Sequence, residues 1–268
     1  MIIGNRAFDV EHETYVMGIL NVTPDSFSDG GTFNTMDKAL RHVEEMVEEG
    51  ADIIDIGGES THPGYTRIGD EEEIDRIVPV IEAVSRRFDV PISVDTYKSG
   101  VAEAAIQAGA NLINDIWGFK ADEKMAALAA RTGVSCCLMH NRNQADYMDF
   151  YRDFISDMRE CVDLAKKAGV ADDKIILDPG VGFGKTHEHN LQIINHVEIL
   201  KELGYPVLLG TSRKSVIGLA LDLPSEERLE GTLATTVLGV WKGCGFVRVH
   251  DVKENKRAIS MTKKIMES

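Results

Sequence analysis

The sequence lacks the features of a membrane-spanning or secreted protein. No apolar run reaches about 18 residues, and the first residues show no basic segment followed by an apolar core. Only four residues are cysteines, and their spacing matches neither a zinc site nor a disulfide framework. We therefore expect no membrane partner, a cytoplasmic location, and cysteines that are reduced and buried.

Positive charge is scarce as well. The 29 Lys and Arg residues are outnumbered by 44 Asp and Glu residues, and the net charge is −15 at pH 7. Because nucleic acids bind to clustered cations, this balance disfavours a nucleic-acid partner. An anionic small molecule would need a local group of cations within an acidic protein. With 43% hydrophobic and 27% charged residues and no linker, residues 1–268 are expected to form one domain.

Strand-like apolar runs alternate with amphipathic helical segments along the chain. Strands are expected near residues 15–20, 51–56, 90–94, 111–114, 134–139, 174–177, 205–209 and 245–249. Strict alternation is typical of parallel strands joined by right-handed crossovers. Eight such units without a composition break favour a (β/α)8 TIM barrel over an open doubly wound sheet. Residues 2–12 are expected to form a flap or hairpin across the bottom of the barrel.

Nearly every predicted strand ends in a polar or charged residue. These residues are Asn21, Asp55, Asp95, Asn114, His140, Asp178, Ser212 with Lys214, and Arg248 with His250. Because parallel strands place their carboxyl ends on one face, we expect these side chains to surround the mouth of the barrel. Individual members could instead cap the helix that follows, since Asp and Asn are good N-caps.

Acceptors and cations occupy different parts of this predicted ring. Asp95, Asn114 and Asp178 suit a flat ligand that presents several N–H donors in one plane. Lys214, and Arg248 with His250, lie at the last two strands, where barrel enzymes often hold phosphate. The residues alone therefore predict a nitrogen-rich heterocycle in the barrel mouth and an anion near its rim.

Six motifs stand out in order along the chain: Leu20-Asn-Val-Thr-Pro-Asp-Ser-Phe-Ser-Asp-Gly-Gly31, Gly58-Glu-Ser-Thr61, Ser93-Val-Asp-Thr96, Asp178-Pro-Gly-Val-Gly-Phe-Gly-Lys185, Ser212-Arg-Lys-Ser215 and Arg248-Val-His-Asp251. Together they resemble the motifs of the dihydropteroate synthase family. The resemblance implies a TIM-barrel transferase of folate biosynthesis. Such enzymes join 6-hydroxymethyl-7,8-dihydropterin diphosphate to 4-aminobenzoate, giving 7,8-dihydropteroate and diphosphate. It further implies Mg²⁺ as cofactor, a homodimer and a sulfonamide target.

The same resemblance assigns site residues, position by position. It implies catalytic roles for Asn21, Asp25, Asp95, Asp178, Lys214, Arg248 and His250. The implied pterin site comprises Asp95, Asn114, Ile116, Met139, Asp178, Phe183 and Lys214. The implied diphosphate site comprises Asn21, Thr61, His62, Arg248 and His250, with Asn21 also binding the metal. The implied aminobenzoate site comprises Phe27, Thr61, Pro63, Phe183, Ser212 and Arg213.

One departure from the family pattern bears on the chemistry. The chain reads Thr61-His-Pro-Gly64 where the family usually has an arginine after the threonine. Because histidine titrates near neutral pH, diphosphate binding is expected to depend on pH through His62. Two alternatives stay open. Methyltetrahydrofolate-dependent methyltransferases share the barrel and pterin contacts, but with no diphosphate to hold they have no use for the predicted cations. A pterin-binding module without turnover is the second alternative.

Two predicted helices carry further features. The acidic run at residues 70–73 is expected to be a helix N-terminal turn, where carboxylates complement the helix dipole. Residues 229–241 place Leu233, Val237 and Val240 on one side of a helix. That side could contribute to a dimer interface, although core packing is the simpler explanation.

Overall fold

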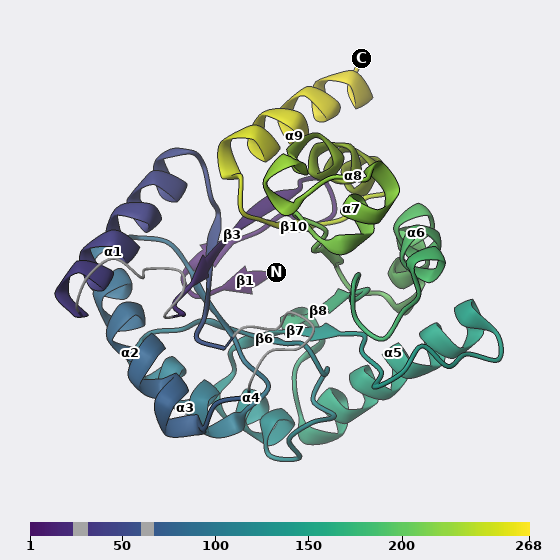
Figure 1. The fold of residues 1–268 in the computed structure, drawn as a ribbon. Helices are drawn as coiled ribbons and strands as arrows, with labels where there is room; N and C mark the ends of the chain where they lie inside the picture. Colours follow the sequence, from purple (N-terminus) through teal and green to yellow (C-terminus); the bar gives the residue numbers. More distant parts are fainter. Residues whose placement is uncertain (24–31, 60–66) are drawn as a thin grey trace.

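The structure, a computed structural model, describes residues 1–23, 32–59 and 67–268, and these form a (β/α)8 barrel (Figure 1). Its parallel strands are β3 (Tyr15–Asn21), β4 (Ile53–Gly57), β5 (Ile92–Asp95), β6 (Leu112–Asp115), β7 (Ser135–Met139), β8 (Ile175–Asp178), β9 (Leu208–Leu209) and β10 (Phe246–Val249). They pair in the order β8-β7-β6-β5-β4-β3-β10-β9. A parallel bridge between Leu177 and Val207 joins the two outer strands and closes the ring. The predicted TIM barrel is confirmed.

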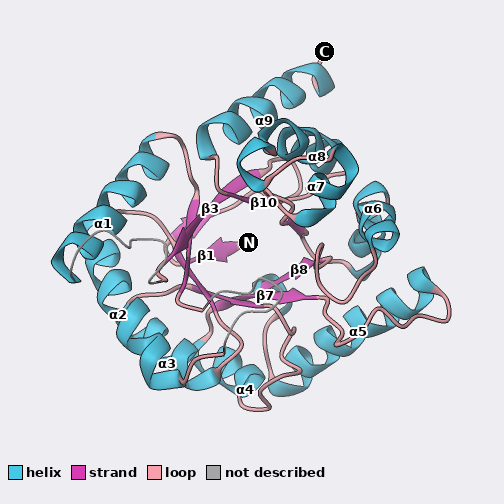
Figure 2. Cartoon of the chain, viewed as in Figure 1, coloured by secondary structure: helices cyan, strands magenta, loops and turns pink. Residues whose placement is uncertain are grey.

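Helices cover the outside of the strand ring (Figure 2). They are α1 (Thr32–Glu48), α2 (Asp70–Arg87), α3 (Ser99–Ala108), α4 (Met125–Thr132), α5 (Phe150–Ala168), α6 (His187–Asn195), α7 (Ser215–Leu221), α8 (Leu229–Trp241) and α9 (Val252–Met266). Among the described residues, no helix is long and apolar enough to cross a membrane. All four cysteines are free and buried, as predicted.

Two elements are shorter than the sequence pattern suggests. The helical pattern of residues 188–203 does not form one helix, because His196 leaves the helical region at φ −123° and ψ 33° and α6 ends at Asn195. A 3₁₀ segment, Val197–Leu203, continues the connection. The strand expected from residue 205 is reduced to β9 (Leu208–Leu209). Pro206 contributes to this shortening because proline has no N–H to donate to a strand ladder.

An N-terminal hairpin covers the bottom of the barrel, as predicted. Strand β1 (Ile2–Ile3) pairs antiparallel with β2 (Arg6–Ala7). Ile3 and Phe8 are buried in one apolar cluster with inward residues of the barrel strands, including Met17. In Figure 1 the hairpin lies at the centre of the ring, so one end of the barrel is plugged.

In every second strand of the barrel, the inward-facing side chains are apolar near the start of the strand and polar or charged near its carboxyl end. Side chains two positions apart in a strand point to the same side. The apolar member of each pair lies in the plugging cluster, and the polar member follows it toward the carboxyl end. These pairs are Ile53 and Asp55, Leu112 and Asn114, Ile176 and Asp178, and Phe246 and Arg248. A polar layer therefore lies directly above an apolar one, at the mouth of the barrel.

Candidate active site in the barrel mouth

Arg248 forms the centre of the polar layer. From β10, its Nε donates to Asp55 Oδ2 and its Nη2 to Asp95 Oδ2, both at 2.6 Å. The Arg248 side chain is 17% exposed, and those of Asp55 and Asp95 are 0% and 8% exposed. Charge-assisted hydrogen bonds of this length in a buried setting hold the guanidinium firmly. Arg248 was expected on the phosphate oxygens, and the structure places it beside the acceptors predicted for the pterin.

Asp95 and Asn114 are neighbours in the strand register, as their predicted shared role requires. Asp95 of β5 lies opposite Asn114 of β6, and Asp95 also lies opposite Gly57 of β4. The buried Asn114 amide donates to Asp55 Oδ2 at 3.2 Å. Yet Asp55 Oδ1 and Asp95 Oδ1, both buried, have no hydrogen-bond partner among the described residues. Buried acceptors are nearly always satisfied, so these two oxygens point to a ligand that supplies donors.

Asp178 and Lys214 complete the mouth next to Arg248, since all three lie close to Gly210. Asp178, buried at the end of β8, accepts the Gly180 N–H at 2.6 Å. Lys214 Nζ donates to the carbonyl of Val181 at 2.7 Å and lies 5.0 Å from the centre of the Phe183 ring. A Cβ atom added at Gly210, in the intervening loop, would lie 3.7 Å from Asp178 Oδ2 and 3.8 Å from Lys214 Nζ. Asp178 and Lys214 therefore border the same small volume.

Burial shifts the proton affinities of these groups. It raises the pKa of the Asp95 carboxyl to about 7, although Arg248 favours its ionised form. Burial also raises the pKa of Asp178, against the effect of the nearby Lys214 ammonium. Burial lowers the pKa of Lys214 to about 8, while Asp178 opposes that change. The site thus holds acids and a base whose charges are poorly solvated, which is typical of functional sites.

His250 and Ser212 lie together on the rim. The Ser212 hydroxyl is 3.0 Å from His250 Nδ1 and accepts the His250 backbone N–H at 3.1 Å. Arg213 forms a two-point ion pair with Asp251, with Nε and Nη2 at 3.0 and 2.5 Å from its oxygens. Its φ of 56° lies in the left-handed region, which costs about 1 kcal/mol in a residue with a side chain. The left-handed backbone of Arg213 forms a tight turn, and Ser212 and Lys214 lie on either side of it in the same loop.

The apolar members of the predicted pterin site also flank the mouth. Ile116, just after β6, is 7% exposed, and Met139 at the end of β7 is 3% exposed. Met139 lies opposite Asp178 in the strand register. Asn21 ends β3 and is exposed, opposite Gly57. The predicted contacts of these residues with substrate or metal stay predictions.

Several predicted site residues lie outside the described part of the chain. These are Asp25, Phe27, Thr61, His62 and Pro63. Their predicted roles therefore have no structural description, and the expected pH dependence through His62 stays a prediction.

Two residues close to the mouth were left out of the predicted site. Asp55 was recognised only as a strand-end acid, but it bridges Arg248 and Asn114. Asp55 lies two positions after the inward-facing Ile53, so its side chain also points into the barrel. This spacing is the sequence signal that could have placed Asp55 in the site. Lys185 Nζ donates to the carbonyls of Gly180 and Phe183 at 2.9 and 3.0 Å, which fixes the glycine-rich turn after Asp178.

Comparison with known proteins agrees with this geometry. Residues 17–250 match the family described as pterin binding enzyme. A dihydropteroate synthase from Clostridium beijerinckii is 62% identical over 98% of both chains. The solved dihydropteroate synthase from Clostridium difficile, in the presence of pteroic acid, is 49% identical with a TM-score of 0.95, covering 98% of this chain and 100% of that one. The solved Yersinia pestis dihydropteroate synthase, in complex with a sulfonamide drug, is 41% identical with a TM-score of 0.93, covering 100% and 99%. This chain belongs to the dihydropteroate synthase family of pterin-binding enzymes.

Proposed function

We propose that the barrel mouth binds the ring of 6-hydroxymethyl-7,8-dihydropterin diphosphate and transfers its methylene carbon to the amine of 4-aminobenzoate. The observation that carries this assignment is a pair of buried carboxylate oxygens, Asp55 Oδ1 and Asp95 Oδ1, that have no hydrogen-bond partner among the described residues. The Asn114 amide bonds to Asp55, and Asp178 is a further buried acid at a strand end, so the mouth offers several acceptors to one planar donor edge. The family's pterin substrate has such an edge of ring and amino N–H groups. Pteroic acid in the Clostridium difficile relative supports the same assignment.

The chemistry follows from the distribution of charge. The C–O bond between the methylene carbon and the diphosphate breaks, and the electron pair leaves with the diphosphate. The positive charge left on the methylene delocalises into the pterin ring, where Asp95 and Asp178 stabilise it through hydrogen bonds to ring N–H groups. The amine of 4-aminobenzoate then forms the new C–N bond and loses a proton. Carboxylates fixed in a buried layer need little reorganisation during this step.

The anion is expected on the rim beside Ser212 and His250. Lys214 and Arg248 supply two cations that lie close together, since a Cβ atom added at Gly210 would be 3.8 Å from both Lys214 Nζ and Arg248 Cβ. The Ser212 hydroxyl at 3.0 Å from Nδ1 fixes the orientation of the His250 ring. A held imidazole and two cations would favour charge growing on a departing diphosphate.

Asn21 is the residue expected to bind Mg²⁺. Its amide oxygen is the kind of hard donor that Mg²⁺ accepts together with water and substrate phosphate oxygens. Among the described residues, no group of three or more His, Cys, Asp or Glu could hold a metal ion. Asn21 and the phosphate oxygens of the substrate would together supply the donors for such a Mg²⁺. Such a metal would neutralise part of the leaving-group charge.

Release of diphosphate on mixing both substrates tests the function directly. Asp178→Ala should lower kcat/KM by about 30- to 1000-fold, because removing a charged, buried hydrogen-bond partner costs about 2–4 kcal/mol. Asp172→Ala is a matched control, since Asp172 is 65% exposed and pairs with the exposed Lys166. Wild-type protein that binds the pterin without releasing diphosphate would favour the binding module. Consumption of methyltetrahydrofolate would favour the methyltransferase.

A homodimer is also proposed, with α7 and α8 contributing to its interface. Val237 and Trp241 on α8 are 39% and 61% exposed, and Leu219 and Leu221 on α7 are 68% and 50% exposed. Val240, predicted on the same side as Val237, is instead 1% exposed and belongs to the core. The outer stripe therefore runs through positions 237 and 241, one helical turn apart. Trp241→Glu should convert the dimer to a monomer in analytical ultracentrifugation.

A further inference from the structure

The turn that follows β8, residues 179–184, carries two groups of the pterin site. Asp178, the last residue of β8, accepts the Gly180 N–H at 2.6 Å, and Phe183 lies within the turn. Three glycines of the turn have positive φ values of 66°, 90° and 55°. Because glycine backbone is freely mobile in the unfolded chain, such a turn needs contacts from outside to hold one shape. We call residues 179–184 the glycine turn.

Lys185 supplies two of these contacts. Its Nζ donates to the carbonyls of Gly180 and Phe183 at 2.9 and 3.0 Å, and it lies 2.8 Å from His140 Nδ1. An ammonium has three N–H donors, and these three acceptors use all of them. Lys185 therefore has no donor left for a substrate and acts only through the residues that it binds.

Asp157 of α5 fixes the hydrogen positions on His140. His140 is fully buried after β7, and its Nε2 lies 2.9 Å from Asp157 Oδ2. Arg142 donates to both Asp157 oxygens at 2.6 and 3.1 Å. Although burial opposes it, the hydrogen bonds from His140 and Arg142 lower the pKa of Asp157. The ionised carboxylate only accepts, so His140 Nε2 carries the hydrogen.

The other ring nitrogen of His140 is then an acceptor. Burial lowers the pKa of His140 to about 4, although Asp157 favours the protonated ring. A neutral imidazole with its hydrogen on Nε2 leaves Nδ1 free to accept from Lys185. We call Asp157, His140 and Lys185 the Lys185 chain. It connects helix α5 with the glycine turn.

The two carbonyls that Lys185 binds belong to the residues that place the pterin groups. Gly180 donates its own N–H to Asp178, and the Phe183 N–H donates to the Gly180 carbonyl at 3.1 Å. Displacing Gly180 would therefore move Asp178 and Phe183 together. The middle of the turn is held separately, because Asn190 accepts the Gly182 N–H at 2.7 Å.

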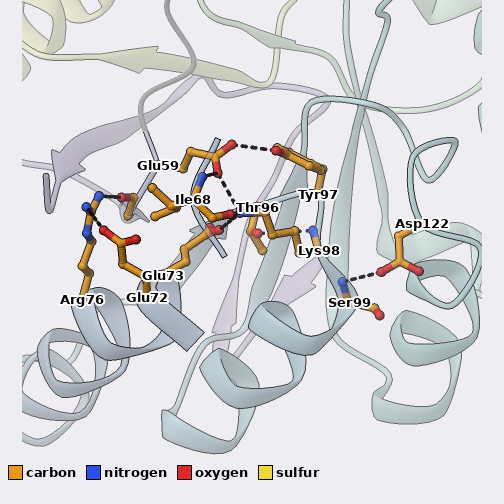
Figure 3. Close-up of polar contacts among 11 residues, drawn as sticks. Glu59, Ile68, Glu72, Glu73, Arg76, Thr96, Tyr97, Lys98, Ser99 and Asp122 are labelled. Carbon is orange, nitrogen blue, oxygen red and sulfur yellow. Dashed lines mark hydrogen bonds and ion pairs between the residues drawn. The ribbon is translucent and has the colours of Figure 1, made fainter. Parts of the chain in front are cut away.

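The charge of Lys185 distinguishes it from Lys98, another lysine near the mouth. Lys98 Nζ donates to Glu59 Oε2 and Glu73 Oε2, both at 2.7 Å, so its charge is balanced by contact (Figure 3). Among the described residues, the hydrogen-bond partners of Lys185 include no carboxylate. Burial lowers the pKa of Lys185, and Asp178 opposes that change. A buried cation without a direct counter-ion is costly, which indicates a role beyond stability.

We propose that Lys185, oriented by His140 and Asp157, is a positioning residue for the pterin ring. It holds the glycine turn so that Asp178 and Phe183 face the barrel mouth. This inference rests on the proposed function, in which Asp178 and Phe183 bind the pterin. Displacing a binding group by about 1 Å can cost about 100-fold, so a support of this kind has a measurable effect.

The test separates binding of the ring from binding of the anion. Isothermal titration calorimetry with 6-hydroxymethylpterin, which lacks the diphosphate, should show a dissociation constant about 10- to 100-fold higher in Lys185→Met than in wild type. The dissociation constant of inorganic diphosphate with Mg²⁺ should stay within about threefold. If wild-type protein binds 6-hydroxymethylpterin but releases no diphosphate from both substrates, the proposed turnover fails, and the calorimetry still tests Lys185.

A second variant tests the Lys185 chain without touching the turn. In Asp157→Asn, the new amide can donate to His140 Nε2, which favours a hydrogen on Nδ1, opposite the Lys185 donor. We expect the dissociation constant of 6-hydroxymethylpterin to rise about 10-fold. Nitrogen-15 NMR of wild-type protein should show His140 neutral with its hydrogen on Nε2. A wild-type His140 with its hydrogen on Nδ1 would overturn the proposal.

A matched lysine separates positioning from stability. Lys256 binds the buried Asp52 at 2.7 Å, beside the start of β4 and thus at the plugged end of the barrel. Lys256→Met should lower stability toward urea while the dissociation constant of 6-hydroxymethylpterin stays within about twofold. Equal losses of ring and diphosphate affinity in Lys185→Met would contradict the proposal. So would an unchanged ring affinity in a folded Lys185→Met protein.

Discussion

Replacing Asp95 by Asn should change the pH dependence of stability in a calculable way. An unfolded Asp has a pKa of about 3.9, and burial raises that of Asp95 to about 7 in the native protein. Between these values the native state holds a proton that the unfolded state has lost, so the unfolding free energy falls as pH rises. This contribution costs the native state about 2 kcal/mol at pH 5.5 and about 4 kcal/mol at pH 8.5. Asparagine does not titrate and carries no such cost.

The difference in unfolding free energy between Asp95→Asn and wild type should therefore shift by about 2 kcal/mol in favour of the variant from pH 5.5 to pH 8.5. Urea unfolding followed by tryptophan fluorescence measures the two unfolding free energies. Other titrating groups such as Asp115 affect both proteins equally, so their contributions cancel in the difference. The variant should also lose most of its turnover, so stability and activity should move in opposite directions. A difference that is the same at both pH values would refute the assignment of Asp95 as a poorly solvated acid.

Two further predictions use the same site. Because burial lowers the pKa of Lys214 to about 8, kcat/KM should fall above that pH as the ammonium that donates to Val181 loses its proton. Lys214→Arg should remove this alkaline limb in a profile from pH 6.5 to 9.5, and an unchanged limb would exclude Lys214 as its source. Gly180→Ala should cost at least about 3 kcal/mol in urea unfolding, since φ is 66° and a Cβ would lie 1.9 Å from the His140 carbonyl oxygen. Gly204→Ala, at φ 85° with no atom within 4 Å, should cost only about 1 kcal/mol.

The barrel and its polar mouth were predictable because both follow from short, regular patterns. An apolar strand that ends in an acid or amide places that side chain on the carboxyl face, whatever the rest of the chain does. Asp95 and Asn114 meet in register for this reason. The inward pairs, such as Ile53 and Asp55, also follow from the two-residue period of a strand.

Pairings between long side chains were not predictable from the same patterns. The pairing of Arg248 with Asp55 and Asp95 was not predicted, because the guanidinium of a long side chain can reach several neighbours. The predicted contact of Arg248 with the diphosphate stays a prediction. Glu73 was interpreted only as a partner of the helix dipole. Its position four residues before the buried Ile77 puts it on the apolar side of α2, and that signal could have identified it as a buried carboxylate.

The unequal number of buried charges explains why the mouth is built for a ligand that brings donors. Among the described residues of this layer, Asp55 and Asp95 share the one guanidinium of Arg248, which already satisfies one oxygen of each of these two acids. It cannot also reach Asp55 Oδ1 and Asp95 Oδ1, which stay unpartnered among the described residues. A purely structural core would remove such acids, because uncompensated buried charge costs several kcal/mol. Retaining them makes sense when a substrate supplies the missing N–H groups and develops positive charge during the reaction, since the layer then binds the transition state more tightly than the ground state.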